Sequence, residues 1–214
     1  MNLEETLKKI LETLEKNIEN NSNEKNLIPI GISNRHVHLC EEHINILFGE
    51  KYELTKLKDL SQLGQYACKE TVIICGPKGS IEKVRVLGPK RKESQIEVSA
   101  GDCIGLGIKS CIKLSGDLKE SSALVLVGPK GSVQLRSGVI VAQRHIHMNQ
   151  NNANELQVKD GELVSIEITG IRGGILNNTC VRVDDSFSLE CHLDVEEANA
   201  MGLSPNSKIK IIKK

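Results

Sequence analysis

The chain has 214 residues, and its 28 basic and 28 acidic side chains give a formal net charge of zero at pH 7. This balance gives no reason to expect nucleic acid or a membrane surface as a partner, and two tyrosines with two phenylalanines are too few for a platform that stacks bases. The length is enough for one large domain or two small ones with a buried core.

The N-terminus gives no targeting signal. No apolar run approaches the roughly 20 residues that a membrane helix needs, and the first residues lack the continuous apolar stretch of a secretory signal. The seven cysteines contain no Cys-x-x-Cys pair. Without a signal we expect reduced thiols and a cytoplasmic protein.

Residues 1–20 carry apolar side chains at helical spacing, with Lys, Glu and Asn on the other faces. The polar stretch 19–26 that follows is predicted to be a linker. We therefore expect an N-terminal amphipathic helix and linker over residues 1–26. A helix this short needs a partner for its apolar stripe, either the protein's own core or a second protein.

From Leu27 onward the pattern is typical of short strands separated by Gly, Pro, Asn and Asp. This predicts a mostly β fold of two small β-barrel domains with short capping helices. The last helix has the clearest boundaries, because Asp194 and Glu197 form a capping box and Gly202 lies past its end. The predicted strands are 84–88, 95–99, 123–128, 133–142, 163–170, 180–183, 190–195 and 208–214, and the predicted helices are 41–48, 151–156 and 195–201.

Two segments repeat the pattern Arg-His-aliphatic-His: SNRHVHLC at 33–40 and AQRHIHMN at 142–149. In a strand, residues i and i+2 share a face, so both imidazoles of each pair should point the same way. The residues between them, Val37 and Ile146, should then lie in the core. The sequence GPKGS also occurs twice, and together these repeats indicate two related half-domains, although Gly-Pro is a common turn former. The histidines concerned are His36, His38, His145 and His147.

A fifth histidine, His192, lies on the same predicted strand face as Glu190. A single His-x-His pair is usually a surface feature or a satisfied pair. Two pairs with a further histidine instead favour a site for zinc or a related metal. Glu97 is the candidate carboxylate, because its neighbours Ile96 and Val98 take the core face, although an exposed glutamate would show the same pattern.

A basic turn precedes Glu97 and contains Lys90, Arg91 and Lys92. Such a triplet is usually solvated charge, but a guanidinium also binds phosphate through two parallel hydrogen bonds. Arg35 and Arg144 should point away from the adjacent histidines and are expected to be structural. A metal acting as Lewis acid beside an arginine fits transfer between a polarised carbonyl and phosphate.

Four segments together resemble the PduL-type phosphate acyltransferases, also called phosphotransacylases: ISNRHVHL, VRVLGPKRKESQIEVS, GVIVAQRHIHM and CHLDVEEANAMGL. The resemblance runs from about Leu27 to the end of the chain. It implies a two-barrel enzyme that transfers a short acyl group, propanoyl or acetyl, reversibly between CoA and inorganic phosphate. It also implies a dinuclear zinc site where the barrels meet.

The resemblance extends to individual positions. It implies that Arg91 contacts the phosphate as a catalytic residue. It implies a discontinuous first barrel, 27–34 plus 143–214, and a second barrel over 35–142. Many such enzymes are cargo of bacterial microcompartments, and residues 1–20 resemble a peptide that docks on a shell protein. The implied metal ligands are His36, His38, Glu97, His145, His147 and His192.

Two other functions stay open at this point. A two-metal hydrolase of phosphate or acyl esters would use the same histidines but would need no CoA groove. A non-catalytic metal-binding scaffold would use the N-terminal helix to dock a partner, but it would not need the segment from Arg91 to Glu97. The sequence also leaves open whether the chain forms a homo-oligomer.

Overall fold

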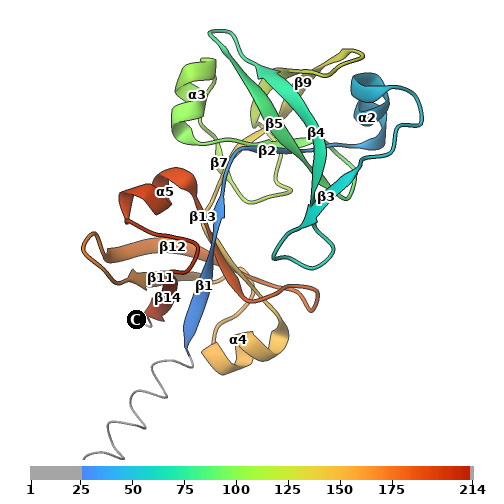
Figure 1. Cartoon of the computed structure of the whole chain (residues 1–214). Helices are drawn as coiled ribbons and strands as arrows, with labels where there is room; N and C mark the ends of the chain where they lie inside the picture. Colours follow the sequence, from blue (N-terminus) through green and yellow to red (C-terminus); the bar gives the residue numbers. More distant parts are fainter. Residues whose placement is uncertain (1–25, 213–214) are drawn as a thin grey trace, which may run out of the picture.

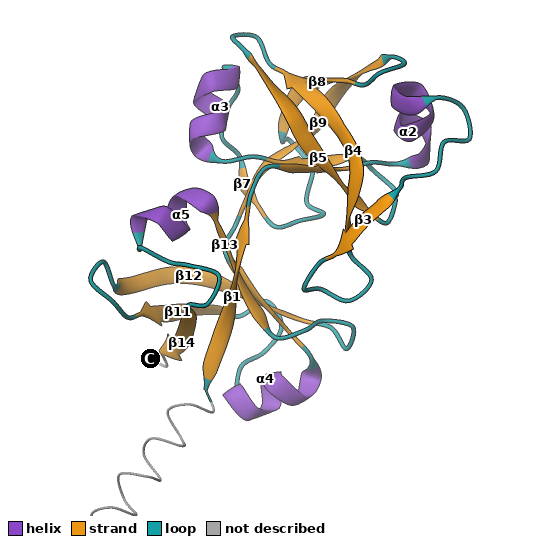
Figure 2. Cartoon of the chain, viewed as in Figure 1, coloured by secondary structure: helices purple, strands orange, loops and turns teal. Residues whose placement is uncertain are grey.

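The computed structural model describes residues 26–212, so the predicted N-terminal helix lies outside the described residues. Strands dominate, and the helices are short (Figure 2). No helix in this range is long and apolar enough to cross a membrane. The elements are β1 Leu27–Ser33, β2 His36–His38, α2 Glu41–Phe48, β3 Lys56–Asp59, β4 Tyr66–Cys75, β5 Ser80–Gly88, β6 Gln95–Glu97, α3 Ala100–Leu106, β7 Ile112–Lys113, β8 Ser122–Val127, β9 Ser132–Ala142, β10 His145–Met148, α4 Gln150–Leu156, β11 Leu163–Ile168, β12 Gly174–Val183, β13 Glu190–Asp194, α5 Val195–Ala200 and β14 Lys208–Ile212.

The strands pair into two closed six-stranded barrels, as the mostly β prediction requires. The terminal barrel has the order β1-β13-β10-β12-β11-β14 and closes where β14 pairs with β1. The central barrel has the order β4-β5-β2-β6-β9-β8 and closes where β8 pairs with β4. Strands β3 and β7 attach to the central barrel at β4 and β9. Each barrel encloses its own cluster of buried apolar side chains.

The two barrels share one pattern of pairing. Strand β2 is parallel to β5 and antiparallel to β6, and β10 is likewise parallel to β12 and antiparallel to β13. One strand of each barrel leads directly into the His-x-His strand of the other barrel, β1 into β2 and β9 into β10. Figure 1 shows the first of these crossings, with β1 in blue rising from the terminal barrel. The crossings place both His-x-His strands where the barrels meet.

The GPKGS repeat does not mark the two barrels, which corrects that part of the prediction. Both copies lie in the central barrel, as the β4–β5 and β8–β9 turns. The backbone N–H of Lys78 donates to the carbonyl of Leu106 at the end of α3, and Lys130 donates likewise to Leu47 in α2. A Cβ on Gly76 would lie 2.2 Å from the Leu106 carbonyl oxygen, so the turn needs glycine there. The repeat therefore caps helix ends.

Helix α3 and strands β3, β4 and β7 were not predicted, and α3 and β4 show the physical reasons. Helix α3 spans seven residues and contains two glycines, so it has weak helical propensity. It forms because Ser99 and Asp102 make a capping box, whereas the sequence predicted that the preceding strand would continue through Ser99. Strand β4 was missed because Glu70 interrupts its apolar pattern. This carboxylate is buried and accepts hydrogen bonds from the Tyr52 hydroxyl (2.9 Å) and the Thr55 amide (3.1 Å).

Candidate metal centre

Four strand–helix units supply the site residues. In each unit a short strand (β2, β6, β10 or β13) is followed by a helix whose N-cap residue is extended. Side chains two and four residues before the N-cap share one face of the strand. The residues two before the N-cap are His38, Glu97, His147 and His192, and those four before it are His36, Gln95, His145 and Glu190.

The central barrel brings three expected ligands together. The register places His36 opposite Glu97, and the ligand atoms of His36, His38 and Glu97 lie within 4.8 Å of one another. His36 Nε2 is 3.5 Å from a Glu97 carboxylate oxygen. Its Nδ1 lies 2.8 Å from the Asn34 carbonyl oxygen, which can only accept, so Nδ1 carries the proton. Nε2 of His36 therefore faces Glu97 and the rest of the group.

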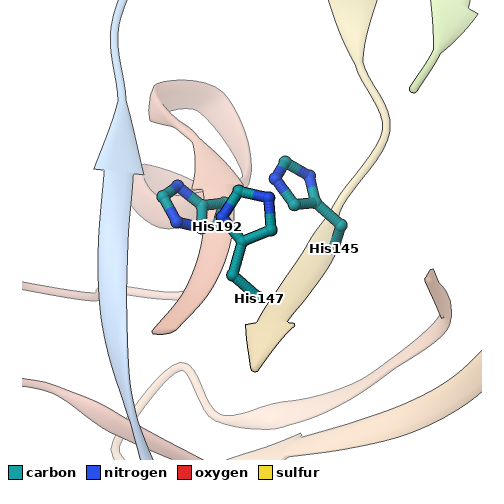
Figure 3. Close-up of side chains that lie close together, drawn as sticks. All are labelled: His145, His147 and His192. Carbon is teal, nitrogen blue, oxygen red and sulfur yellow. The ribbon is translucent and has the colours of Figure 1, made fainter. Parts of the chain in front are cut away.

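The terminal barrel brings the other three together. The register places His145 opposite His192, and the ligand atoms of His145, His147 and His192 also lie within 4.8 Å of one another. Figure 3 shows the three rings gathered between β10 and β13. His145 Nδ1 lies 2.8 Å from the carbonyl oxygen of Gln143, which repeats the contact of His36 with Asn34. The two His-x-His strands are thus held in the same way.

The chemistry of both groups fits a metal ion. Burial lowers the pKa of His38 and His147 to about 2 and that of His145 to about 4, so these imidazoles are neutral and keep a lone pair. Burial acts to raise the pKa of Glu97, but the charge and hydrogen bond of His36 dominate and hold it well below the usual range. Both ring nitrogens of His147 and Nδ1 of His38 are buried and have no hydrogen-bond partner among residues 26–212. Such neutral imidazoles with a carboxylate are a typical donor set for zinc.

Arg91 lies beside the central group. Its backbone N–H donates to the Leu39 carbonyl (2.9 Å), and its Nη1 donates to Ser115 Oγ (3.0 Å). The same Ser115 Oγ accepts from Gln95 Nε2 (2.8 Å), which also donates to the Glu97 carboxylate (2.7 Å), so the guanidinium lies close to the ligands. The other two basic residues of the turn are exposed, and Lys90 pairs with Glu41 at 2.9 Å. Arg91 is therefore the one member of the triplet that faces the site.

A second arginine near the site was missed. Arg182 lies opposite His147 in the β10–β12 register, and its guanidinium carbon is 5.7 Å from the centre of the Phe187 ring. Phe187 in turn stacks on His147 with ring centres 4.0 Å apart. Arg182 therefore lies beside the three-histidine group of the terminal barrel. The sequence offered only the strand pattern CVRV at this position.

The two arginines that precede the histidine pairs have the structural role expected of them. Arg35 makes two hydrogen bonds to Asp102, of 2.9 and 2.8 Å, and Arg144 Nε donates to Glu197 at 2.6 Å. Both acidic partners are the third residues of their helices, α3 and α5. His43, which is not one of the expected ligands, is half-buried with Nδ1 2.7 Å from Ser94 Oγ.

Comparison with known proteins gives one consistent result. The profile of the family described as "Phosphate propanoyltransferase" matches residues 29–204. A phosphate propanoyltransferase of Rhodobacter capsulatus is 50% identical over 187 residues, which cover 87% of each chain. One from Thermotoga maritima is 48% identical, covering 86% of this chain and 89% of its own. One from Alkaliphilus metalliredigens is 40% identical over 210 residues, covering 98% of this chain and 99% of its own.

Proposed function

Because this chain belongs to the phosphate propanoyltransferase family, we propose that it transfers a short acyl group, propanoyl or acetyl, reversibly between CoA and inorganic phosphate. The membership confirms the resemblance found in the sequence and the class of acyltransferase enzyme. The observation that carries the proposal is the pairing of two buried donor groups with an arginine at the meeting of the barrels.

We propose that each donor group holds one zinc ion, with His36, His38 and Glu97 as one set of ligands. His145, His147 and His192 would form the other set. A bound zinc ion supplies a Lewis acid that polarises a carbonyl or phosphoryl oxygen. The neutral His38, His145 and His147 and the ionised Glu97 support this assignment, because these four ligands need no loss of protons near pH 7.

Arg91 is proposed to orient the phosphate for attack on the thioester carbonyl. Ser115 holds one end of its guanidinium at 3.0 Å, which leaves other N–H groups for an oxyanion. We propose direct attack by phosphate, with CoA leaving as the thiolate or thiol. Burial raises the pKa of Cys103 to about 11 and that of Cys191 to about 12, so neither supplies a thiolate nucleophile.

The domain division is proposed to follow the barrels, with 27–34 plus 143–214 as one domain and 35–142 as the other. Residues 1–26 are proposed to dock the enzyme on a microcompartment shell protein in the cytoplasm. Deleting them should leave the specific activity and the melting temperature unchanged but abolish co-assembly with shell proteins. A large drop in melting temperature would mean instead that this segment packs on the enzyme's own core.

The proposed reaction is tested by thiol release. Propanoyl-CoA or acetyl-CoA is incubated with and without orthophosphate, and both free thiol and acyl phosphate are measured. We expect CoA release that requires phosphate and matches the acyl phosphate formed. Release without phosphate would indicate the hydrolase instead, and no release with any short acyl-CoA would favour the scaffold.

A further inference from the structure

Glu190 lies next to the three-histidine group but is not one of its expected ligands. It comes two residues before His192 on β13 and faces His147 in the register with β10. Within its strand–helix unit it holds the position that His36 and His145 hold in theirs. It is half-buried against β1, where a Cβ on Gly31 would come within 2.8 Å of its carboxyl carbon.

One carboxylate oxygen of Glu190 receives three contacts. The Oε2 atom lies 2.5 Å from Ser61 Oγ, 3.0 Å from His192 Nε2 and 3.1 Å from Gln62 Nε2. The Gln62 amide nitrogen can only donate, and the Ser61 hydroxyl donates to the same atom, so Oε2 of Glu190 acts as a hydrogen-bond acceptor.

The contact fixes the proton on His192. Because Oε2 of Glu190 can only accept, Nε2 of His192 must donate, and the lone pair is left on Nδ1. His145 has the opposite arrangement, since its Nδ1 donates to the Gln143 carbonyl and its lone pair is on Nε2. A carboxylate that accepts the second N–H of a ligating histidine orients the ring and makes it a better donor to the metal.

The residues that hold Glu190 come from the other barrel. Ser61 and Gln62 lie in the loop between β3 and β4, which belong to the central barrel. Gln62 is 9% exposed and is fixed at both ends of its amide, since Nε2 donates to the Ser188 carbonyl (3.2 Å) and Oε1 accepts from the Ser188 amide (3.3 Å). This loop thus joins the central barrel to the histidine group of the terminal barrel.

We infer that Glu190 is a positioning residue that fixes His192 with Nδ1 toward the metal, and that Ser61 and Gln62 are a latch from the central barrel that holds Glu190 in place. The inference rests on the proposed metal group of the terminal barrel but not on the identity of the acyl substrate. It makes the terminal group depend on a segment more than 120 residues away in the chain.

The test measures metal affinity in the full chain without substrate. Zn²⁺ and Co²⁺ are titrated in competition with a chromophoric chelator. The H36A/H38A and H145A/H147A variants identify which bound metal equivalent belongs to the central group and which to the terminal group. E190Q should weaken metal binding at the terminal group about 10–100-fold and leave metal binding at the central group unchanged. The S61A/Q62A double variant keeps the carboxylate and should weaken the same equivalent by a smaller factor. The Co²⁺ absorption of the terminal group should shift in both.

Glu196 provides the matched control. Its Oε1 also joins the barrels, accepting from Ser99 Oγ (2.7 Å) and the Gly101 amide (2.9 Å), but it contacts no histidine. E196Q should therefore leave the terminal equivalent unchanged. The inference is overturned if E190Q binds metal as the parent does, if E196Q weakens the terminal equivalent as much, or if the parent's terminal group binds no metal. A parent that binds both equivalents but fails the thiol-release assay refutes only the proposed function.

Discussion

The two barrels repeat one strand–helix unit, yet they build different donor groups from it. The positions two and four residues before each N-cap are His36, His38, Gln95 and Glu97 in the central barrel. In the terminal barrel they are His145, His147, Glu190 and His192. Each set contains one carboxylate, but its position differs by two residues along the strand. Glu97 lies among the donor atoms, whereas Glu190 lies behind His192. The same fold can therefore place a carboxylate either among the donor atoms of a proposed metal group or one hydrogen bond behind them.

The largest effect should come from removing either pair of histidines. H36A/H38A and H145A/H147A should each lose one metal equivalent and reduce acyl transfer by at least about 10³-fold, because a Lewis acid contributes several kcal/mol to the transition state. Metal content is measured by elemental analysis and activity by thiol release. Full metal retention in H145A/H147A would contradict the assignment of one metal group to each barrel, since the terminal histidines would then not be ligands.

The next effect separates Arg91 from its neighbours in the basic turn. R91A should lower kcat/KM for phosphate about 10²–10³-fold and keep the metal content, because it removes a donor to the transferred oxyanion. R91K should restore little activity, since lysine lacks the planar fork. K90A is the matched control, because Lys90 is exposed and pairs with Glu41. Equal phosphate kinetics in R91A and the parent would refute the assignment.

A buried carboxylate, Glu70, and a half-buried one, Glu197, should give opposite responses to acid. Burial opposes ionisation of Glu70, but hydrogen bonds from Thr55 and Tyr52 lower its pKa, so its stabilising contribution is present above pH 4.5 and is lost below it. E70Q should cost about 1–3 kcal/mol at pH 7, and its difference from the parent should shrink as the pH falls.

For Glu197 the sign is reversed. Burial raises its pKa, so protonation stabilises the folded state as the pH falls toward 4.5. The difference between the parent and E197Q should therefore grow in acid. Urea unfolding of the parent and both variants from pH 7 to pH 4 measures these trends, and parallel curves would contradict them.

The smallest effect compares the two arginines that hold helix starts. Arg35 and Asp102 are 39% and 10% exposed, and Arg144 and Glu197 are 28% and 20% exposed. R35A and R144A should each reduce the free energy of unfolding by about 1 kcal/mol, because partly exposed ion pairs contribute little. Chemical denaturation measures both. A loss well above this value in only one variant would show that the two crossings between the barrels are not equivalent.

Local patterns in the sequence predicted the features that depend on strand geometry. Alternation placed Val37 and Ile146 in the core and the paired histidines on one face, and both placements agree with the structure. It also separated Arg35 and Arg144 from the site. The structure brings the six expected ligands together in two groups, although their role as ligands stays a prediction.

The features that the sequence could not predict depend on contacts between distant segments. Ser61 and Gln62 meet Glu190 across 129 and 128 residues, and no local pattern indicates such a contact. The equivalence of Glu97 with His192 is visible only when β6 and β13 are aligned by their helices. The GPKGS repeat was misleading because it reflects a duplication inside one barrel.

The position of β1 has a consequence for synthesis on the ribosome. All six strands of the central barrel lie between residues 36 and 142, so this barrel can close while the chain is still growing. Strand β1 emerges before it, and its pairing partners among the described strands are β13 and β14. At a synthesis rate of ~5–20 residues per second, β1 with its apolar Ile28 and Ile30 stays unpaired for roughly 10–30 s until β13 and β14 are made. Pro29 has no N–H to donate, so the unpaired strand is a poorer template for pairing with another chain.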